Sequence, residues 1–286
     1  MDKKKLGLLS KCIAAVLAFG LFCVLVLWFK DFDKGTDTGY QVVCMGDSNF
    51  GNVRDNTGVV NILGENLGKN VLNAAFGGST ITAKNGYKTE YQSALSMHSL
   101  AVSICNGNFG TQKAAIVALN RRSGAEDYAE TLKNLSNVDF DSVELLLIEH
   151  GVNDYLSGVP VKNGRDVYDT STFDGTFRTI ITMLREEYPD MRIVLATPAY
   201  CAPIAEDGTY RYCDEYDYGG GYLEDYVNAE IELAKELNVE IIDLYHGLDI
   251  HKDNFETYLY DGLHFNEYGR KLVADSMAEF LLGDTE

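Results

Sequence analysis

The sequence predicts an α/β fold: a three-layer sandwich with a five-stranded, mainly parallel sheet between helices, preceded by one transmembrane helix. Five short apolar runs alternate with segments whose apolar residues recur every three or four positions, which indicates strands alternating with helices. Several runs are almost continuously apolar, as expected for strands that helices cover on both faces. A longer uncharged run near the N-terminus has the length of a bilayer-spanning helix.

Residues 1–30 are predicted to be a basic cytoplasmic stub and a membrane anchor. Four lysines within residues 1–11 precede the uncharged run 12–29. The run is longer than the apolar middle of most signal peptides and lacks small residues at a cleavage site, so we favour an uncleaved anchor over a removed signal. Because the basic side of a span stays in the cytoplasm, we expect a single-pass plasma-membrane protein with an extracellular domain.

Residues 31–39 read as a short polar linker and residues 40–286 as one folded domain. The whole chain has 24 basic and 43 acidic residues, and without residues 1–30 it keeps 19 and 42, a net charge of −23. Such a domain repels nucleic acid and anionic lipid, so we expect no nucleic-acid partner and membrane contact through the N-terminal helix alone. Solubility outside the cell is the simplest reason for this charge.

The predicted strands are the apolar runs at residues 40–45, 70–75, 143–149, 191–197 and 239–244. Helices are predicted from apolar residues at three- and four-residue spacing. They lie near residues 57–68, 111–121, 125–136, 172–188, 222–238 and 266–282. The carboxyl ends of parallel strands meet at one edge, where open sheets build their sites.

A long loop at residues 200–222 follows the fourth predicted strand. At that edge the loop could line a substrate cleft, with its aromatic rings stacking on sugars, or it could be a plain surface insertion. The sequence favours neither alternative. Its candidate side chains are Tyr210, Tyr212, Tyr216 and Tyr218.

No metal or cofactor site is predicted. The sequence lacks Cys-x-x-Cys and His-x-x-x-His patterns. Cys201 and Cys213 flank a polar loop and are candidates for a disulfide in an oxidising compartment, but their spacing leaves bonded and free thiols equally open. The adjacent Glu149 and His150 are interpreted as a structural pair in which the histidine has its hydrogen bonds satisfied.

Ser48 is the candidate nucleophile. It follows the first strand within Gly46-Asp-Ser48, so its hydroxyl is expected to project at the carboxyl edge of the sheet after a tight turn that Gly46 permits. Alone, so short a motif is more often an ordinary turn, and the Gly-x-Ser-x-Gly elbow of the larger α/β-hydrolases is absent from the sequence. A serine nucleophile also needs a histidine base and an acid that orients it.

Amide donors are predicted at two neighbouring strand ends. Gly77-Gly78 follows the second strand and Asn153 follows the third. Amides fixed around a developing oxyanion are worth about 3–4 kcal/mol each when they are removed. The Ser48 N–H, the Gly78 N–H and the Asn153 side chain would supply three donors, although each motif taken singly is usually structural. Asp154 is expected only to brace its loop.

Two Asp-x-x-His sequences compete for the role of base and acid. Asp243–His246 ends the fifth strand, and Asp261–His264 lies in a loop that enters the last helix. The spacing is the same in both. Gly262 inside the second turn and Asn266 near the helix start suit a compact turn that holds both side chains to one side, which favours His264.

Gly46-Asp-Ser48, Gly78, Gly151-Val-Asn153-Asp154 and Asp261–Gly269 resemble, in order and spacing, the four blocks of the SGNH (GDSL-type) hydrolase family. The resemblance spans nearly the whole exterior domain and implies a flavodoxin-like SGNH hydrolase fold in a membrane-anchored member of bacterial type. It implies Ser48 as nucleophile, His264 as base and Asp261 as the orienting acid. Gly78, Asn153 and the Ser48 amide would form the oxyanion hole, without metal or cofactor.

Gly78 is chosen over Gly77 because it stands five residues after Asn73 and just before Ser79, as the family glycine usually does. Two positions depart from the family pattern and concern local packing. Asn49 occupies the position at which the name GDSL records leucine, and Phe265 replaces a proline often found after the histidine.

The resemblance implies a serine esterase acting on O-acyl esters, chiefly O-acetyl groups, of extracellular or envelope carbohydrate. The expected partner is therefore an acyl-ester substrate, a glycan or a lipid. A lysophospholipase or lipase and an O-acyltransferase would use the same residues, and a non-catalytic glycan-binding module is the alternative of another class.

Overall fold

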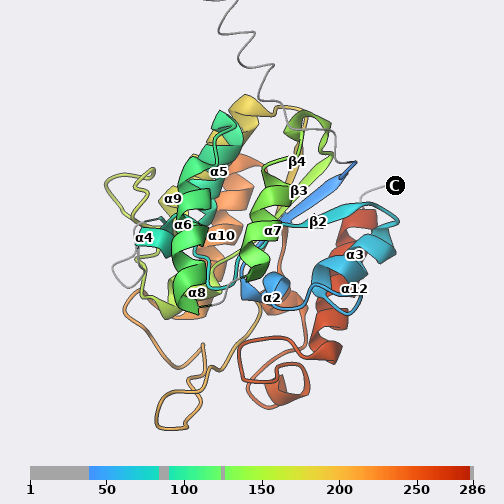
Figure 1. Ribbon diagram of the computed structural model, residues 1–286. Coiled ribbons are helices and arrows are strands. Elements are labelled where there is room, and N and C mark those ends of the chain that lie inside the picture. Colours follow the sequence, from blue (N-terminus) through green and yellow to red (C-terminus); the bar gives the residue numbers. More distant parts are fainter. Residues whose placement is uncertain (1–38, 84–89, 124–125, 284–286) are drawn as a thin grey trace, which may run out of the picture.

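The computed structural model describes residues 39–83, 90–123 and 126–283, and it confirms the predicted α/β sandwich (Figure 1). The sheet has the strand order β2-β1-β3-β4-β5, and all four neighbouring pairs are parallel. Each strand lies within a predicted apolar run: β1 (Val42–Met45), β2 (Val71–Asn73), β3 (Leu145–Glu149), β4 (Arg192–Ala196) and β5 (Glu240–Ile242).

The centre of the sheet is formed by β1 and β3, in which every residue is buried. The chain passes from β1 to β2 on one side and later crosses to β3 on the other side. Where the strand order changes direction in this way, the connections leave in opposite directions and open a crevice at the carboxyl ends of the strands. The residues that follow β1 therefore occupy the place at which open α/β sheets bind ligands.

All six predicted helices are present, as α3 (Val59–Leu67), α6 (Gly110–Ser123), α7 (Glu126–Leu135), α9 (Phe173–Glu187), α10 (Leu223–Leu237) and α12 (Glu267–Gly283). The additional helices are α2 (Ser48–Gly51), α4 (Glu90–Ser93), α5 (Met97–Asn106), α8 (Val152–Leu156) and α11 (Leu244–Gly247), with short 3₁₀ turns at Phe140–Ser142 and Phe255–Thr257. Four of these additional helices are no more than about a turn long.

Of the additional helices, α5 is a full-length element that the sequence analysis missed. Its residues Met97, Leu100 and Ile104 are buried at helical spacing. Ser96 caps the start by accepting a hydrogen bond from the Ser99 N–H, and Gly107 ends the helix in the left-handed conformation. Both are ordinary helix boundary signals, so this element was readable from the sequence.

Helices cover both faces of the sheet. α3 and α12 pack together on one side, and α9 packs against α5 and α10 on the other (Figure 1). The long loop after β4 and the loop that enters α12 lie at the same end of the molecule, the end at which β1 leads into α2 (Figure 1). The fold thus gathers the predicted site segments at one edge.

In the described part of the chain, none of the helices combines the length and apolarity that a membrane span requires. The predicted stub and anchor at residues 1–30 lie outside the described residues, as does the predicted linker 31–39 except for its last residue.

A buried carboxyl group lies on α10. Glu230 is only 1% exposed, and neither of its carboxylate oxygens has a hydrogen-bond partner among the described residues. Burial raises its pKa well above the ordinary value, and the charges of Asp243 and Asp154 raise it further. We infer that folding favours the protonated form of this side chain.

We predict that Glu230→Gln makes the domain less sensitive to alkaline pH. The folded state keeps a proton that the unfolded state releases, so this group's stabilisation is complete below the ordinary carboxyl pKa and is lost as pH rises toward the raised pKa. The loss is at most ~1.4 kcal/mol per pH unit. Urea unfolding between about pH 5 and about pH 9 should show a shallower decline for Glu230→Gln than for the wild type.

Glu232→Gln, on the same helix but exposed and paired with Lys162, is the matched control and should keep the wild-type slope. Parallel declines for the wild type and Glu230→Gln would show that Glu230 ionises normally in the folded protein.

Candidate active site

Ser48 begins α2 immediately after β1. The Asp47 carboxylate caps this short helix by accepting a hydrogen bond from the Asn49 N–H at 2.9 Å. At Gly46, any Cβ would come within 2.8 Å of the Phe50 ring, so the tight turn between strand and helix requires glycine there. The predicted turn is confirmed, and it presents Ser48, which is partly exposed, at the carboxyl edge of the sheet.

A continuous chain of hydrogen bonds joins Ser48 to His264 and Asp261. The Ser48 Oγ lies 3.0 Å from the His264 Nε2, and the His264 Nδ1 lies 2.7 Å from the Asp261 Oδ2. The two segments are 216 residues apart in sequence. This geometry allows the imidazole to take the hydroxyl proton while the carboxylate orients the ring.

The turn from Asp261 to His264 is held by backbone and side-chain contacts. The Asp261 Oδ1 accepts hydrogen bonds from the N–H groups of Leu263 (3.0 Å) and His264 (2.8 Å). Gly262 has φ +77°. A Cβ on it would lie 2.0 Å from the Ala202 carbonyl oxygen, so the loop after β4 touches this turn backbone to backbone.

The start of the last helix supports the same turn. The Asn266 Oδ1 accepts a hydrogen bond from the Gly269 N–H at 3.1 Å, and its amide group donates to the Thr257 carbonyl at 2.9 Å. Phe265 is buried and pairs with Leu259 across an antiparallel bridge, so it packs where the family often has proline. Gly262 and Asn266 thus have the roles expected from the sequence, because both hold the compact turn from Asp261 to His264.

The Asp261 carboxylate is stabilised in its ionised form. Burial alone acts to raise its pKa, but the hydrogen bonds from the His264 ring and from the amides of His264 and Leu263 outweigh burial and lower the pKa below its ordinary value. The acid beside His264 therefore carries its negative charge throughout the neutral range.

The competing histidine forms a similar pair in another place. The His246 Nδ1 lies 2.8 Å from the Asp243 Oδ2, and its Nε2 lies 3.6 Å from Glu224. Burial acts to lower the pKa of His246, but these two carboxylates raise it above its ordinary value. Its Nε2 faces an acid instead of a hydroxyl, so His264 is the histidine in contact with Ser48.

Asp47 holds Asn153 next to the turn that carries Ser48. The Asn153 Nδ2 donates to the Asp47 Oδ2 at 2.8 Å, which joins the segments that follow the neighbouring strands β1 and β3. Asp47 is fully buried. The sequence analysis treated Asp47 only as part of the motif and did not predict that its carboxylate links the nucleophile turn to the asparagine.

Asp154 braces its loop, as predicted. It is fully buried and accepts hydrogen bonds from the Ile81 N–H at 2.8 Å, the Thr82 N–H at 3.2 Å and the Thr82 hydroxyl at 2.9 Å. These bonds tie α8, which carries Asn153, to the segment that follows Gly78. The two predicted oxyanion segments are therefore connected to each other.

Gly77 and Gly78 form a turn next to Ser48. Gly78 has φ +72°, a conformation that glycine adopts without strain. A Cβ on Gly77 would lie 3.7 Å from the Ser48 Cβ and 2.8 Å from the Tyr128 hydroxyl, which donates to the Gly77 carbonyl at 2.9 Å. Gly77 lies near Ser48, and the assignment of the oxyanion donor to Gly78 stays a prediction.

The tyrosines of the 200–222 loop pack against the rest of the protein. Tyr210 and Tyr212 contact Phe255, at ring-centroid distances of 4.9 Å and 6.1 Å. Tyr218 packs on Tyr155 of α8 at 5.0 Å and on Tyr216 at 4.7 Å. These contacts give the four rings a structural role, and their contact with a substrate stays a prediction.

One exposed ring at the site was not singled out from the sequence. Tyr260 stacks on the His264 imidazole, with centroids 5.6 Å apart and planes inclined by 19°. Tyr260 is 61% exposed as a whole residue, whereas only 20% of the His264 side chain is exposed. The sequence signal available was a tyrosine directly before the Asp261 turn.

The Glu149-His150 pair differs from the prediction. Both residues are buried, but neither His150 ring nitrogen nor the Glu149 Oε2 has a hydrogen-bond partner among the described residues. Burial lowers the pKa of His150 to about 3 and raises the pKa of Glu149 well above its ordinary value, to which the charge of Asp47 adds. The prediction of a satisfied histidine is wrong, and the imidazole is buried in its neutral form.

Cys201 and Cys213 are adjacent and buried, and both are free thiols. The Cys213 N–H donates to the Cys201 carbonyl at 3.0 Å, and the Cys201 N–H donates to the Cys213 Sγ at 3.4 Å. Of the two alternatives that the sequence left open, the structure has the unbonded thiols, which lie side by side. No cluster of three or more His, Cys, Asp or Glu side chains suited to a metal ion occurs among the described residues.

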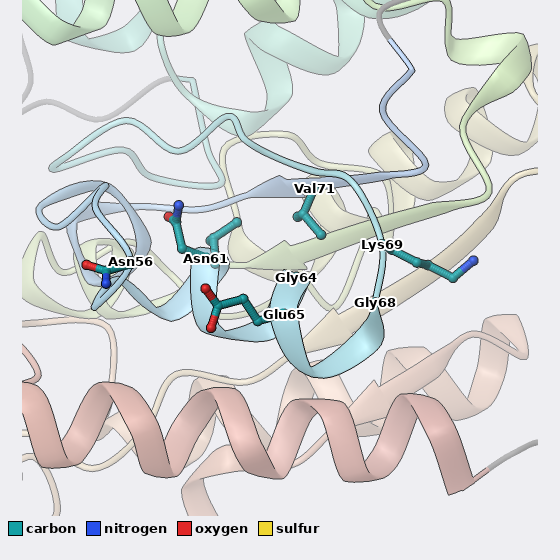
Figure 2. A pocket seen from close by; sticks show the side chains of 8 residues that line it. Asn56, Asn61, Gly64, Glu65, Gly68, Lys69 and Val71 are labelled. Atoms are coloured by element: carbon teal, nitrogen blue, oxygen red, sulfur yellow. The ribbon is translucent and has the colours of Figure 1, made fainter.

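A hollow of about 370 Å³ over α3 is separate from this site (Figure 2). Its lining includes Asn61 and Glu65 of α3 together with Lys69 and Val71 at the start of β2. None of the residues around Ser48 described above lines it.

Residues 44–272 match the model of the GDSL-like lipase/acylhydrolase family. This segment is most of the chain and contains all the residues of the hydrogen-bonded chain at Ser48, so the protein belongs to that family. The family is one of lipases and acylhydrolases, which are enzymes that hydrolyse esters.

The chain is also similar to two curated eukaryotic proteins. It is 23% identical over 128 residues to the mouse isoamyl acetate-hydrolyzing esterase 1 homolog, covering 43% of this chain and 49% of that protein. It is 29% identical over 119 residues to a GDSL esterase/lipase of Arabidopsis thaliana, covering 36% of this chain and 44% of that protein. The chain thus spans about half the length of the curated relatives it matches.

Solved structures share the fold at low identity. A Lactobacillus plantarum protein matches with a TM-score of 0.60 and 18% identity, covering 86% of this chain and 98% of its own. A family two carbohydrate esterase from Clostridium thermocellum, solved in complex with cellohexaose, matches with a TM-score of 0.52 and 15% identity, covering 87% of this chain and 66% of its own.

We predict that Gly262→Ala abolishes ester hydrolysis. The new Cβ cannot be accommodated 2.0 Å from a backbone oxygen, so the turn must move and separate His264 from Ser48. Gly208→Ala is the matched control, because Gly208 also has positive φ (+83°) but has nothing within 4 Å of its Cβ position. It should cost about 1 kcal/mol of stability and no activity. Equal activities of the two variants in an acetate-release assay would contradict the required close contact.

Proposed function

We propose that the protein is a serine esterase in which Ser48, His264 and Asp261 form the catalytic triad. The observation that supports this most directly is the unbroken hydrogen-bonded chain from the Ser48 hydroxyl to the Asp261 carboxylate. The family to which the chain belongs is one of lipases and acylhydrolases, which fits that chemistry.

In the proposed mechanism, the Ser48 oxygen attacks the ester carbonyl while the His264 Nε2 takes the hydroxyl proton. Asp261 keeps its negative charge and stabilises the imidazolium that forms. The tetrahedral oxyanion is bound by the amides of Ser48 and Gly78 and by the side chain of Asn153. His264 then protonates the leaving alcohol, and water releases the acid from the acyl-enzyme by the same route.

For the substrate we propose O-acyl esters, chiefly O-acetyl groups, on extracellular or envelope carbohydrate. The exposed Tyr260 ring beside His264 supports a sugar as the alcohol part, because the base and the leaving alcohol must lie on the same side of the carbonyl. The carbohydrate esterase among the structural relatives is consistent with this class.

We further propose that residues 1–30 anchor the enzyme in the plasma membrane with its catalytic domain outside. The lysines before the uncharged run 12–29 support this orientation. The strong negative charge of the remaining domain suits an exterior location, where it favours solubility.

The triad assignment predicts the relative effects of three substitutions. Ser48→Ala and His264→Ala should each lower kcat for acetate release from a small ester by about 10³-fold or more. His246→Ala removes a similar Asp-paired histidine and should keep nearly full activity. An active-site-directed phosphonate should label wild-type Ser48. Normal turnover by Ser48→Ala, or a larger loss in His246→Ala than in His264→Ala, would reject this assignment.

The substrate proposal predicts that Tyr260→Ala raises KM for an acetylated oligosaccharide by about threefold to tenfold, since ring stacking is worth on the order of 1 kcal/mol. Hydrolysis of ethyl acetate should change little, because this ester has no ring to stack. Tyr268→Ala removes an even more exposed tyrosine from α12 and should change neither KM. Equal losses on both esters in Tyr260→Ala would mean that the ring only supports His264.

Comparing the release of acetate with that of longer acyl groups, with and without a glycan acceptor, separates the remaining alternatives. A preference for long acyl chains would identify a lipase or lysophospholipase. Acyl transfer to the glycan in place of hydrolysis would identify an O-acyltransferase, and glycan binding without any turnover would identify a binding module.

A further inference from the structure

We propose that Tyr128 is a positioning residue for catalysis: its hydroxyl fixes the orientation of the peptide group between Gly77 and Gly78, and thereby the direction of the Gly78 N–H. This inference rests on the proposed function, in which that N–H binds the oxyanion. Tyr128 lies on α7, outside every segment that the sequence motifs indicated.

The turn at these glycines has two possible forms. The Ser79 N–H donates to the Phe76 carbonyl at 3.0 Å, so Gly77 and Gly78 are the two central residues of a β-turn. Gly78 has φ +72°, whereas Gly77 is not among the residues with positive φ. This combination is a type II turn. A type I turn has the same ends, but its central peptide group faces the opposite way.

Glycine at both central positions allows either form, because glycine adopts positive and negative φ about equally well. The choice between the forms must therefore come from outside the turn. The Gly77 carbonyl accepts a hydrogen bond from the Tyr128 hydroxyl at 2.9 Å. Flipping the peptide would break this bond.

The same bond sets the direction of the Gly78 N–H. The Gly77 carbonyl and the Gly78 N–H belong to one planar peptide group and point in opposite directions. The Tyr128 ring is itself held edge-on against Phe76, at the start of the same turn, with centroids 5.5 Å apart and planes at 81°. A hydroxyl on a fixed ring thus defines the plane of the predicted oxyanion donor.

The turn is close enough to Ser48 for this orientation to affect the reaction. A Cβ on Gly77 would lie 2.8 Å from the Tyr128 hydroxyl and 3.7 Å from the Ser48 Cβ. A side chain at residue 77 would therefore force the Tyr128 hydroxyl away from the turn, and the same position also faces Ser48. If this N–H turned away from the oxyanion, the transition state would lose a hydrogen bond. Substrate binding would not change, because the oxyanion does not yet exist in the ground state.

Tyr128→Phe tests the proposal by removing one oxygen atom. We expect kcat for a small acetate ester to fall by about tenfold or more, part of the roughly 10²–10³-fold effect of losing an oxyanion donor, while KM changes by less than about twofold. Affinity for an alkyl boronic acid, which forms a tetrahedral adduct with the serine, should fall by a similar factor. A purely structural tyrosine would not separate kcat from KM in this way.

Tyr188→Phe is the matched control. The Tyr188 hydroxyl also donates to a backbone carbonyl, that of Ile104, at 3.0 Å, and this bond lies away from Ser48. The control should keep the wild-type kcat and boronate affinity, and thermal unfolding should show both variants folded.

Equal kcat values for Tyr128→Phe and Tyr188→Phe would overturn the inference, as would a rise in KM at unchanged kcat. Neither result would affect the proposed function, which depends on the loss of activity in Ser48→Ala. If Ser48→Ala stayed active, the proposed function would fail and this inference with it.

Discussion

The site depends on the buried carboxylate of Asp47. This side chain has no exposed surface, and a desolvated carboxylate persists only where hydrogen bonds replace its lost water. One of its oxygens accepts from the Asn49 amide and so caps the helix that presents Ser48. The other accepts from the Asn153 side chain. A single anion thereby sets the distance between the nucleophile and the predicted oxyanion asparagine, which come from the ends of two adjacent strands.

A second set of contacts joins the remaining segments. Asp154 ties α8 to the backbone after Gly78, and Gly262 brings the acid turn against the loop that follows β4. Breaking the first contact would leave a buried carboxylate without hydrogen bonds, which costs free energy. Replacing the glycine in the second would make a Cβ clash with a backbone oxygen. The precision of the site therefore comes from buried neighbours of the reacting groups, and only in part from the reacting groups themselves.

The fold could be predicted from the sequence almost completely. The alternation of apolar runs and amphipathic segments located five strands and six helices, because sheets covered on both faces leave a strong pattern. The helix at Met97–Asn106 was missed although Ser96 and Gly107 mark its ends. Of the site, Ser48, His264 and Asp261 were predicted and are in contact, since a strand end and a glycine turn are local features that a sequence shows.

What could not be predicted depends on contacts between distant segments. No local pattern indicates that the Asp47 carboxylate reaches Asn153, that the hydroxyl of Tyr128 meets Gly77, or that Tyr260 stacks on His264. Spacing also could not distinguish the two Asp-x-x-His turns, since both form the same pair, at 2.8 Å and 2.7 Å. Gly262, Asn266 and the family resemblance favoured the second turn, and the structure distinguishes the two by the Ser48 hydroxyl that lies beside His264. His150 shows the reverse case, because this buried side chain has no hydrogen-bond partner within the part of the chain that the structure describes.

The order of these segments along the chain has a consequence for biosynthesis. Ser48 follows the first strand, whereas the last strand ends at Ile242 and His264 comes only after it, at the entrance to α12. During translation the whole sheet can therefore emerge before the base exists. The surface of α3 that packs against α12 also remains uncovered until α12 has been synthesised. In the proposed mechanism a nascent chain therefore lacks its base until residue 264 has been synthesised, just before the helix that completes the core.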